Sequence, residues 1–412
     1  MKRAVITGCG VVTPLGNKKE VFWDNIKCGT SGVDLITTFD SSNLPCKVAA
    51  KVKDFDPTNY MEKKDSRRMD LFVQYAVAAA LMAVEDSKIV VNDENSDRVG
   101  VIIGSGIGGI TTFEEQYKSF LIKGPNRVSP FFIPMLISNM GTGQVSIFTG
   151  AKGMNLTTVS ACASGADAVG QAALTIARGD ADVMIAGGAE ASVSMLPFIG
   201  FCAMKAMSTR NVEASKACSP FDANRDGFVM GDGAGVLIIE ELEYAKKRNA
   251  DIIAEIVGYS STNDAYHITA PLKDGSGAAR CMSNALIKAQ LSPESIDYIN
   301  AHGTSTHHND KAETIAIKKV FGDYSYEIPI SSTKSMTGHL LGAAGAIETI
   351  ITAFAINENF LPPTINYEVF DPECDLDYVP NLGRYKEINY AISNSFGFGG
   401  HNACIVLKKY IS

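Results

Sequence analysis

Apolar residues in the first half of the chain alternate between short runs and longer runs with helical spacing. A continuous apolar run of a few residues is typical of a buried strand, and apolar residues three and four apart are typical of one face of a helix. Strands are therefore predicted at 3–6, 98–103, 155–160, 182–186 and 236–240. Helices are predicted at 19–26, 63–82, 166–178 and 241–248, and the stretch 192–235 is predicted to be irregular.

The same alternation begins again at Asp251. Strands are predicted at 252–259, 296–300, 328–332, 391–395 and 403–408, and helices at 277–289 and 339–355. The last two strands flank a glycine-rich stretch at 396–400 and predict a hairpin. Strands that alternate with helices in both halves predict an α/β architecture with an internal duplication, divided into residues 1–250 and 251–412.

Cys162 lies between the strand predicted at 155–160 and the helix predicted at 166–178, which Gly179 ends. The N-terminus of a helix favours an anion, because its backbone N–H groups are free and the helix dipole is positive there. A thiolate gains from this position, so the turn predicts a reactive cysteine with small neighbours that leave room for a substrate. The alternative is a buried structural cysteine, which is the more common fate of a free thiol.

Composition restricts the class of protein. Of 412 residues, 46% are hydrophobic and 20% are charged, so a large core is expected, and the net charge of -8 argues against a nucleic-acid-binding protein. Nine cysteines without a C-x-x-C pair favour a reducing cytoplasm. Gly8, Gly10 and Pro14 interrupt the apolar N-terminus, which is interpreted as a first strand and not a signal peptide. No apolar run approaches the roughly 20 residues that cross a bilayer, so no membrane association is expected.

Gly104, Gly106 and Gly109 follow a predicted strand with the spacing of a dinucleotide-binding turn. Such a site also needs an acidic residue at the end of a second strand about 20 residues later. Residues 126–134 contain no acidic residue. A nucleotide-binding oxidoreductase is therefore the minor alternative, and the glycines are expected to let backbone segments approach each other near a pocket.

His302 and His339 stand in glycine-rich turns after predicted strands of the second half, and Lys334 lies close to the second of them. Sites in α/β folds gather beyond the carboxyl ends of strands, so the two histidines and Lys334 are candidate partners of Cys162. His307, His308 and His401 are interpreted as surface residues. A metal site is not expected, because the histidines lack the paired spacing with carboxylates that such sites show.

Four motifs together resemble the elongating β-ketoacyl-[acyl-carrier-protein] synthases, most closely synthase II of bacterial type II fatty acid synthesis. They are SACASG at 160–165, NAHGTST at 300–306, KSMTGHLLGAAG at 334–345 and NSFGFGG at 394–400. The resemblance covers the whole chain. It implies the thiolase fold, in which two βαβαβαββ halves stack as α-β-α-β-α layers, and a cytoplasmic homodimer that acts with acyl carrier protein.

The resemblance also implies the chemistry. Cys162 would carry the acyl chain as a thioester, and the backbone N–H groups of Cys162 and Phe398 would form the oxyanion hole. His302 and His339 would bind the malonyl thioester carbonyl and stabilise the enolate formed on decarboxylation. Lys334 would support the histidines, with Glu313 as the partner of its charge. No organic cofactor is expected, since the thioester supplies the activation.

Further residues receive roles from the same resemblance. Thr304 and Thr306 would contact the phosphopantetheine arm, and Phe398 would act as a gate over Cys162. The expected acyl and substrate pocket consists of Ile107, Phe201, Phe396 and, from a dimer partner, Phe132. The residues expected to meet the carrier protein are Lys64, Arg67, Arg68 and Lys205. The residues that match a monovalent-cation site of some relatives are Asn300, Glu348, Ser393 and Asn394. A ketosynthase of a secondary-metabolite pathway with its own carrier protein is the main alternative, because it would share these motifs.

Overall fold

The computed structural model describes residues 2–411, and within this range ten strands form one continuous sheet. The strands of the first half are β1 (Ala4–Val12), β4 (Val99–Gly104), β5 (Asn155–Leu156), β6 (Val183–Glu190) and β7 (Gly233–Glu241). Those of the second half are β8 (Ala254–Asn263), β9 (Tyr298–Asn300), β10 (Ile330–Ser331), β13 (Tyr390–Gly397) and β14 (His401–Lys408). The spatial order is β10-β9-β13-β14-β8-β1-β7-β6-β4-β5.

This order confirms the predicted duplication. From the centre outward the first half runs β1-β7-β6-β4-β5 and the second runs β8-β14-β13-β9-β10, so each strand has a counterpart in the same place. The directions agree as well, because β4 is parallel to β5 and β6 as β9 is parallel to β10 and β13. The halves meet where β1 pairs antiparallel with β8, with Ala4 opposite Ile256.

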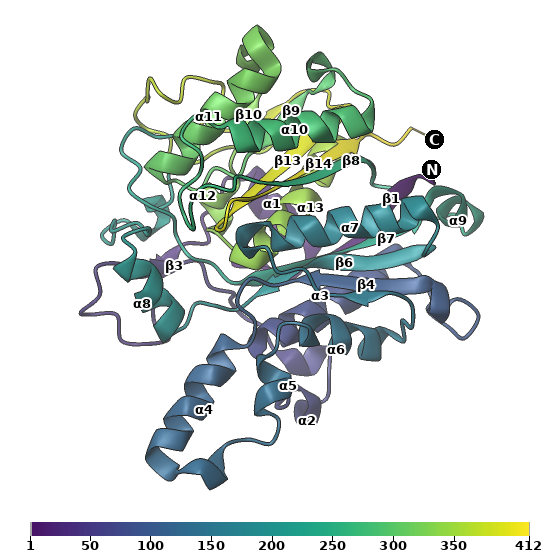
Figure 1. Cartoon of the computed structure of the whole chain (residues 1–412), viewed down its shortest axis with the longest axis vertical. Coiled ribbons are helices and arrows are strands. Elements are labelled where there is room, and N and C mark those ends of the chain that lie inside the picture. The colour runs from purple at the N-terminus through teal and green to yellow at the C-terminus, as the bar shows by residue number, and fades with distance from the viewer. Residues whose placement is uncertain (1, 412) are drawn as a thin grey trace.

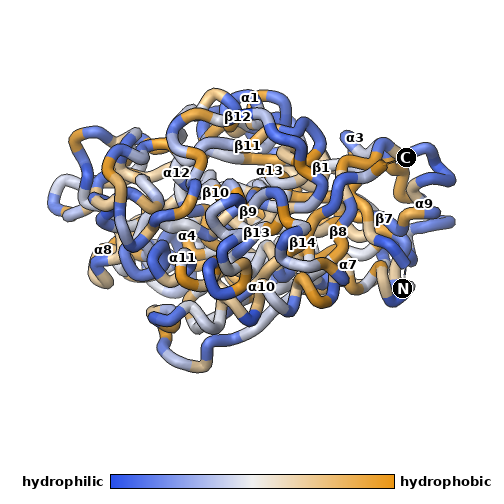
Figure 2. Tube along the Cα trace, turned by 90° about the horizontal axis from the view of Figure 1, so that it is seen from above, coloured by the Kyte–Doolittle hydropathy of each residue, from blue (hydrophilic) through white to orange (hydrophobic). Residues whose placement is uncertain are grey.

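Three pairs of helices complete the predicted α-β-α-β-α layers (Figure 1). Helices α3 (Leu71–Ser87) and α6 (Met140–Thr149) cover the outer face of the first half, and α10 (Ser276–Ala289) and α11 (His307–Phe321) cover that of the second. Helices α7 (Ser164–Arg178) and α13 (Ala344–Glu358) form the middle layer, and their apolar residues share one core with both halves of the sheet. Figure 2 shows these hydrophobic central segments beside hydrophilic outer loops.

Small residues let α7 and α13 cross at short range. A Cβ atom at Gly165 would lie 2.9 Å from the backbone nitrogen of Ala346, and one at Gly345 would lie 2.6 Å from that of Ala166. Larger side chains at either glycine would push the helices apart. The N-termini of both middle helices are thereby held together, and the motifs at 160–165 and 334–345 lie at these ends.

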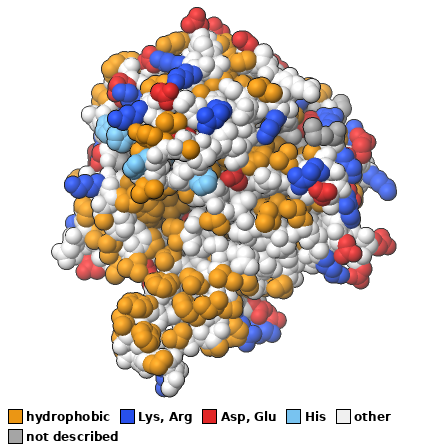
Figure 3. Space-filling model, viewed as in Figure 1, with side chains coloured by type: hydrophobic (Ala, Val, Ile, Leu, Met, Phe, Trp, Pro, Cys, Tyr) orange, Lys and Arg blue, Asp and Glu red, His pale blue; other side chains and the backbone are white. Residues whose placement is uncertain are grey.

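The remaining elements lie outside these layers. They are helices α1 (Lys19–Lys27), α2 (Lys63–Ser66), α4 (Ile110–Lys123), α5 (Phe132–Leu136), α8 (Met195–Ala203), α9 (Leu242–Lys247) and α12 (Lys334–Thr337), with the small strand pairs β2 (Asp34–Leu35) with β3 (Val48–Ala49) and β11 (Phe360–Leu361) with β12 (Arg384–Tyr385). Helices α4 and α5 form a lobe that protrudes from the body (Figure 1), and its surface is largely hydrophobic in Figure 3. None of the helices described is long and apolar enough to cross a membrane.

Several predicted elements differ from the structure. The strand predicted at 155–160 ends at Leu156, because residues 157–160 turn toward the N-terminus of α7. The basic run at 63–68 does not begin the long helix: it forms the separate α2, and α3 starts at Leu71, where the carboxylate of Asp70 caps it by accepting from Phe72 N–H. The stretch 192–235 contains helix α8, and the helix predicted from 339 begins only at Ala344.

Candidate active site

Cys162 lies in a single 3-10 turn, Ala161–Ala163, that leads directly into α7. The turn begins with Ala161 at a φ of 52°, a left-handed conformation that is unusual for a residue with a side chain. This bend directs the thiol into a cavity while leaving only 8% of Cys162 exposed. The predicted position of Cys162 at a helix N-terminus is confirmed.

The predicted stabilisation of a thiolate is outweighed by burial. Burial raises the pKa of the Cys162 thiol to about 11, although the charge of Lys334 and the backbone N–H groups of Phe398 and Cys162 act to lower it. The resting group at neutral pH is therefore a thiol. The same two N–H groups point at the sulfur, which is the arrangement that an oxyanion hole beside this atom requires.

A matching turn in the second half lies beside the cysteine. Leu341–Ala343 form a 3-10 turn before α13, and Leu341 has a φ of 47°, the counterpart of the strained Ala161. His339 precedes this turn, and its N–H donates to the carbonyl of Val229 at 2.7 Å. The duplication thus brings a histidine from one half to the cysteine of the other.

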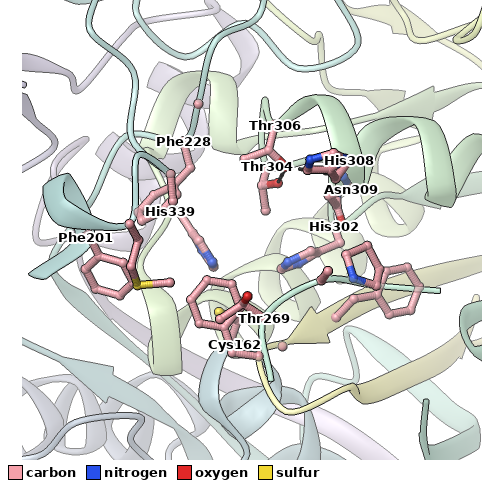
Figure 4. Close-up of a pocket in the computed structure, with 18 of the residues that line it drawn as sticks. Cys162, Phe201, Phe228, Thr269, His302, Thr304, Thr306, His308, Asn309 and His339 are labelled. Atoms are coloured by element: carbon pink, nitrogen blue, oxygen red, sulfur yellow. Dashed lines mark hydrogen bonds between the residues drawn. The ribbon is translucent and has the colours of Figure 1, made fainter. Parts of the chain in front are cut away.

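His302 and His339 face each other across the cavity, with ring centroids 5.3 Å apart and an angle of 83° between the rings. Figure 4 shows their ring nitrogens directed into the space above Cys162. Both rings are buried, and desolvation together with the nearby charge of Lys334 holds the pKa of each well below its ordinary value. Two neutral imidazoles can each donate one N–H to a carbonyl or enolate oxygen.

The predicted pair of Lys334 with Glu313 is wrong, because the Lys334 ammonium group donates to the carboxylate of Glu348 on α13. Glu313 instead accepts from the backbone N–H groups of His302 and Gly303, each at 2.8 Å. Burial raises the pKa of Glu313 to about 7. Glu313 therefore holds the turn that carries His302, and Lys334 acts on the histidines through its charge.

The four residues that match a cation site each contain a buried oxygen without a hydrogen-bond partner. These atoms are Asn300 Oδ1, Glu348 Oε2, Ser393 Oγ and Asn394 Oδ1. Oxygen ligands of this kind suit a hard cation, so the residues present fit such an ion. Within residues 2–411 no group of His, Cys, Asp and Glu has the arrangement of a site for a metal ion.

The cavity has a volume of about 380 Å³ and contains most of the predicted site. The predicted residues that line it are Cys162, Phe201, Lys205, His302, Thr304, Thr306, His339, Phe396 and Phe398. The hydroxyl oxygens of Thr304 and Thr306 are 3.0 Å apart on one wall (Figure 4). His307 and His308, which the sequence placed at the surface, are exposed residues that also line this cavity.

Cys162 belongs to an apolar cluster of side chains, several of which also line the cavity. The cluster includes the buried Phe198 and Leu341, against which Ile107 and Phe201 pack. The ring of Phe201 meets that of Phe228 at 5.2 Å and that of Phe398 at 6.3 Å. Phe132 lies on α5 and does not line this cavity, so its predicted place in an acyl pocket stays a prediction.

Sequence reasoning missed the segment that holds the loop of Phe398. The carboxylate of Asp264 accepts from the side-chain amide of Asn402 at 2.7 Å, and the N–H of Asp264 donates to the carbonyl of Gly400 at 2.9 Å. Asp264 lies in an irregular polar stretch after β8, and no motif in that stretch indicates a site. Lys64, Arg67 and Arg68 are exposed outside the cavity, and the Arg68 guanidinium lies 4.7 Å from the ring centroid of Phe131.

The chain is similar to known proteins in both its sequence and its fold. The family model of the beta-ketoacyl synthase N-terminal domain matches residues 1–245, and that of the beta-ketoacyl synthase C-terminal domain matches residues 253–368. The chain is 51% identical over 409 residues to a 3-oxoacyl-[acyl-carrier-protein] synthase 2 of Synechocystis, covering 99% of this chain and 98% of the relative. It is 52% identical over 408 residues to the protein of the same name from Coxiella burnetii, covering 99% of each.

Solved structures agree. A beta-ketoacyl synthase from Burkholderia phymatum superposes with a TM-score of 0.93 at 38% identity, and covers all of both chains. A ketosynthase in complex with its type II PKS acyl-carrier protein, bound to the hexaketide, superposes with a TM-score of 0.92 at 38% identity over the same full length. With a cysteine and two neutral histidines facing one cavity, and with relatives of this similarity along its whole length, the chain belongs to the beta-ketoacyl synthase family.

Proposed function

We propose that this protein is a 3-oxoacyl-[acyl-carrier-protein] synthase that joins an acyl group to malonyl-carrier protein and so lengthens a fatty acid by two carbons. The observation that carries the proposal is the convergence of Cys162, His302 and His339 on one cavity. The relatives named for fatty acid chemistry are 51–52% identical to this chain, whereas the polyketide ketosynthase is 38% identical. This difference favours fatty acid synthesis over a secondary-metabolite pathway.

The first step is acyl transfer. The sulfur of Cys162 attacks the thioester carbonyl of the acyl-carrier protein, and the N–H groups of Cys162 and Phe398 donate to the oxygen as it becomes negative. Collapse of this intermediate forms the acyl-Cys162 thioester. The carrier leaves as its pantetheine thiol, which takes the proton that Cys162 lost. Burial raises the pKa of this thiol to about 11, so the neutral thiol is the form that meets the acyl thioester.

The second step is condensation. Malonyl-carrier protein enters beside Thr304 and Thr306, and its thioester oxygen accepts from the neutral rings of His302 and His339. Loss of carbon dioxide leaves an enolate, whose negative oxygen these two donors stabilise. The enolate carbon attacks the acyl-Cys162 carbonyl, the C–S bond breaks, and the 3-oxoacyl carrier protein is released. The sulfur then regains a proton from solvent.

Mass spectrometry after mixing with acyl-carrier protein tests the acyl-transfer step. We expect the intact protein to gain one acyl mass, located on the peptide that contains Cys162, and the Cys162→Ala variant to gain none. Cys281→Ala is the matched control, because Cys281 is also buried but lies on α10 in the core of the second half. Retained condensation by Cys162→Ala would exclude Cys162 as the nucleophile.

The carrier protein is proposed to dock on the exposed basic residues Lys64, Arg67, Arg68 and Lys205. Their charge contrasts with the net charge of -8 of the whole chain, so they offer an acidic partner a local positive surface. Arg67→Glu is expected to weaken binding of the carrier about tenfold. Lys246→Glu, which reverses an exposed charge on α9, should leave the binding affinity unchanged.

A homodimer is proposed to bury the edge of the sheet at β5 and the lobe of α4 and α5. Between residues 128 and 160 the only charged residue is Lys152, and the side chains of Ile133, Ile147 and Val159 are exposed. Ile147 is 70% exposed, so Ile147→Asp should convert the dimer to a monomer in light scattering. Ile287→Asp on α10 alters an equally exposed residue (71%) and should leave the dimer intact.

The protein is further proposed to act in the cytoplasm without an organic cofactor, and to hold a monovalent cation among the oxygens of Asn300, Glu348, Ser393 and Asn394. The buried oxygens of these residues that have no hydrogen-bond partner support the proposal of a bound cation. Replacing potassium and sodium by a bulky organic cation should lower the melting temperature of the wild type. Asn300→Leu should remove that difference, and a wild type insensitive to the replacement would contradict the ion.

A further inference from the structure

A carboxylate that sequence reasoning did not single out lies behind the cavity. Glu190 is the last residue of β6 and is completely buried. It accepts from the N–H of Gly106 at 2.7 Å, the N–H of Ile107 at 3.2 Å, and the hydroxyl of Ser105 at 3.3 Å. All three donors belong to the glycine turn that resembled a dinucleotide-binding site.

The glycine turn is thus an anion-binding turn whose anion is part of the protein. Successive backbone N–H groups that point to one place form a concave site for a negative group, as in phosphate-binding loops. Here the carboxylate of Glu190 fills that site. A Cβ atom at Gly106 would lie 2.8 Å from Glu190 Oε2, which explains a glycine at this position without a nucleotide.

The same carboxylate reaches the other half of the molecule. The N–H of Gly342 donates to Glu190 Oε2 at 3.0 Å, and a Cβ atom at Gly342 would lie 2.6 Å from this oxygen. Gly342 lies in the turn that joins His339 to α13, as Cys162 lies in the turn before α7. Glu190 therefore joins a turn of the first half to a turn of the second beside the nucleophile.

Both turns carry a side chain of the apolar cluster that contains Cys162. Ile107 follows Gly106 in the first turn, and Leu341 precedes Gly342 in the second. We propose that Glu190 is a positioning residue that holds Ile107 and Leu341 at a set separation, and so determines which acyl chains fit beside Cys162. This inference rests on the acyl-transfer function proposed above.

The four contacts also define the charge state of Glu190. The four groups that hydrogen-bond to it all donate, and an ionised carboxylate is a pure acceptor. The buried carboxyl of Asp232 also lies near enough for the charge of Glu190 to raise its pKa. Burial raises the pKa of Glu190, and these donors lower it. The negative charge in turn raises the pKa of the Cys162 thiol. A change at Glu190 should therefore appear in the reactivity of the sulfur as well as in the shape of the pocket.

Two substitutions distinguish the hydrogen bonds by which Glu190 joins the two turns from the effect of its negative charge. Glu190→Asp keeps the charge but is one methylene shorter, so it cannot reach both turns. Glu190→Gln keeps the length but removes the charge and turns an N–H group toward donors. Glu240→Gln is the matched control, since Glu240 is equally buried on the neighbouring strand β7 but pairs with Arg248 at the end of α9, away from the pocket.

The first readout is the single-turnover rate of Cys162 acylation by acyl-pantetheine thioesters of increasing length. For Glu190→Asp we expect the ratio of acylation rates between the best and the poorest acyl chain to fall about tenfold. A misplacement of the pocket side chains by about 1 Å is enough for an effect of this size. Glu240→Gln should keep the wild-type ratio. A folded Glu190→Asp protein with the wild-type ratio would overturn the proposal. If this variant does not fold, Ser105→Ala removes one donor and should flatten the ratio to a smaller degree, and an unchanged ratio would overturn the proposal equally.

The second readout is alkylation of Cys162 by iodoacetamide at about pH 8, followed on its own peptide because the chain contains other cysteines. Glu190→Gln should be alkylated several-fold faster than the wild type, since loss of the negative charge lowers the thiol pKa, and Glu190→Asp should stay closer to the wild type. A purely structural role predicts no difference in alkylation rate between Glu190→Gln and Glu190→Asp. Equal alkylation rates in the wild type and both variants would therefore refute the effect of the Glu190 charge on the thiol. A wild type that no thioester acylates would refute the proposed function instead, and alkylation would still report on Glu190.

Discussion

At the scale of single residues, the site combines groups whose charges are set by burial. Cys162 stays a thiol and both histidines stay neutral, while Lys334 pairs with Glu348. Each histidine must be neutral and must still donate a hydrogen bond. A neutral imidazole does both, because one of its two ring nitrogens carries a hydrogen. The positive charge of Lys334 disfavours a second positive charge on either ring, which keeps them neutral under mild acid.

Lys334→Met tests this arrangement. Decarboxylation of malonyl-carrier protein by the wild type should continue below the ordinary histidine pKa of about 6.5, because the folded protein lowers the pKa of both rings. Without the lysine charge the pKa of each ring rises, so the acidic limb of the rate profile should move to higher pH by on the order of one unit. The rate of carbon dioxide release between pH 5 and 9 measures the shift.

The control for this experiment is Lys311→Met, which removes a lysine on the exposed side of α11 that pairs with Glu373. Its acidic limb should coincide with that of the wild type. A folded Lys334→Met protein with an unmoved limb would show that Lys334 does not set the charge of the histidines.

At the scale of elements, the contact of α7 with α13 determines whether the two catalytic turns meet. Gly345→Ala is expected to destabilise the protein by about 1–3 kcal/mol, because its Cβ would lie 2.6 Å from the backbone nitrogen of Ala166. Gly200→Ala on α8 is the matched control, since its Cβ would meet nothing within 4 Å. A helical alanine there should stabilise by about 0.5–1 kcal/mol. Urea denaturation measures both, and an unaffected Gly345→Ala protein would contradict the tight crossing.

Element prediction succeeded where the local pattern and the packing agreed. Helix α7 and the hairpin of β13 and β14 follow from their apolar spacing and glycine boundaries, because both are buried on the faces that the pattern indicates. It failed at 339–343, where apolar residues are buried in a turn and not in a regular element, and at 155–160, where Leu156 and Val159 are exposed. Burial of a turn depends on contacts with the other half, and a local pattern contains no information about them.

At the scale of the whole molecule, electrostatic attraction to the carrier should act against the overall charge of the enzyme. The net charge of -8 repels an acidic carrier protein, and the exposed basic residues must attract it at short range. Raising the NaCl concentration from about 50 to about 500 mM should screen this attraction and increase KM for acyl-carrier protein about tenfold, while kcat changes little.

Acyl-pantetheine without the carrier is the control for this salt dependence. Its KM should not follow the salt concentration, because it lacks the acidic protein surface. If both substrates responded alike, the salt would act on the enzyme itself and the proposed docking surface would be contradicted.

The family, the duplication and the candidate residues Cys162, His302, His339 and Lys334 could be predicted from the chain alone, because short motifs and strand–helix periodicity are local properties. The pairing of charges could not. The tertiary structure paired Lys334 with Glu348 and not with Glu313, left the thiol protonated, and placed Glu190 in a turn that had resembled a nucleotide site. Partners and desolvation depend on groups that lie far apart in the chain, so they exist only once the two halves have packed together.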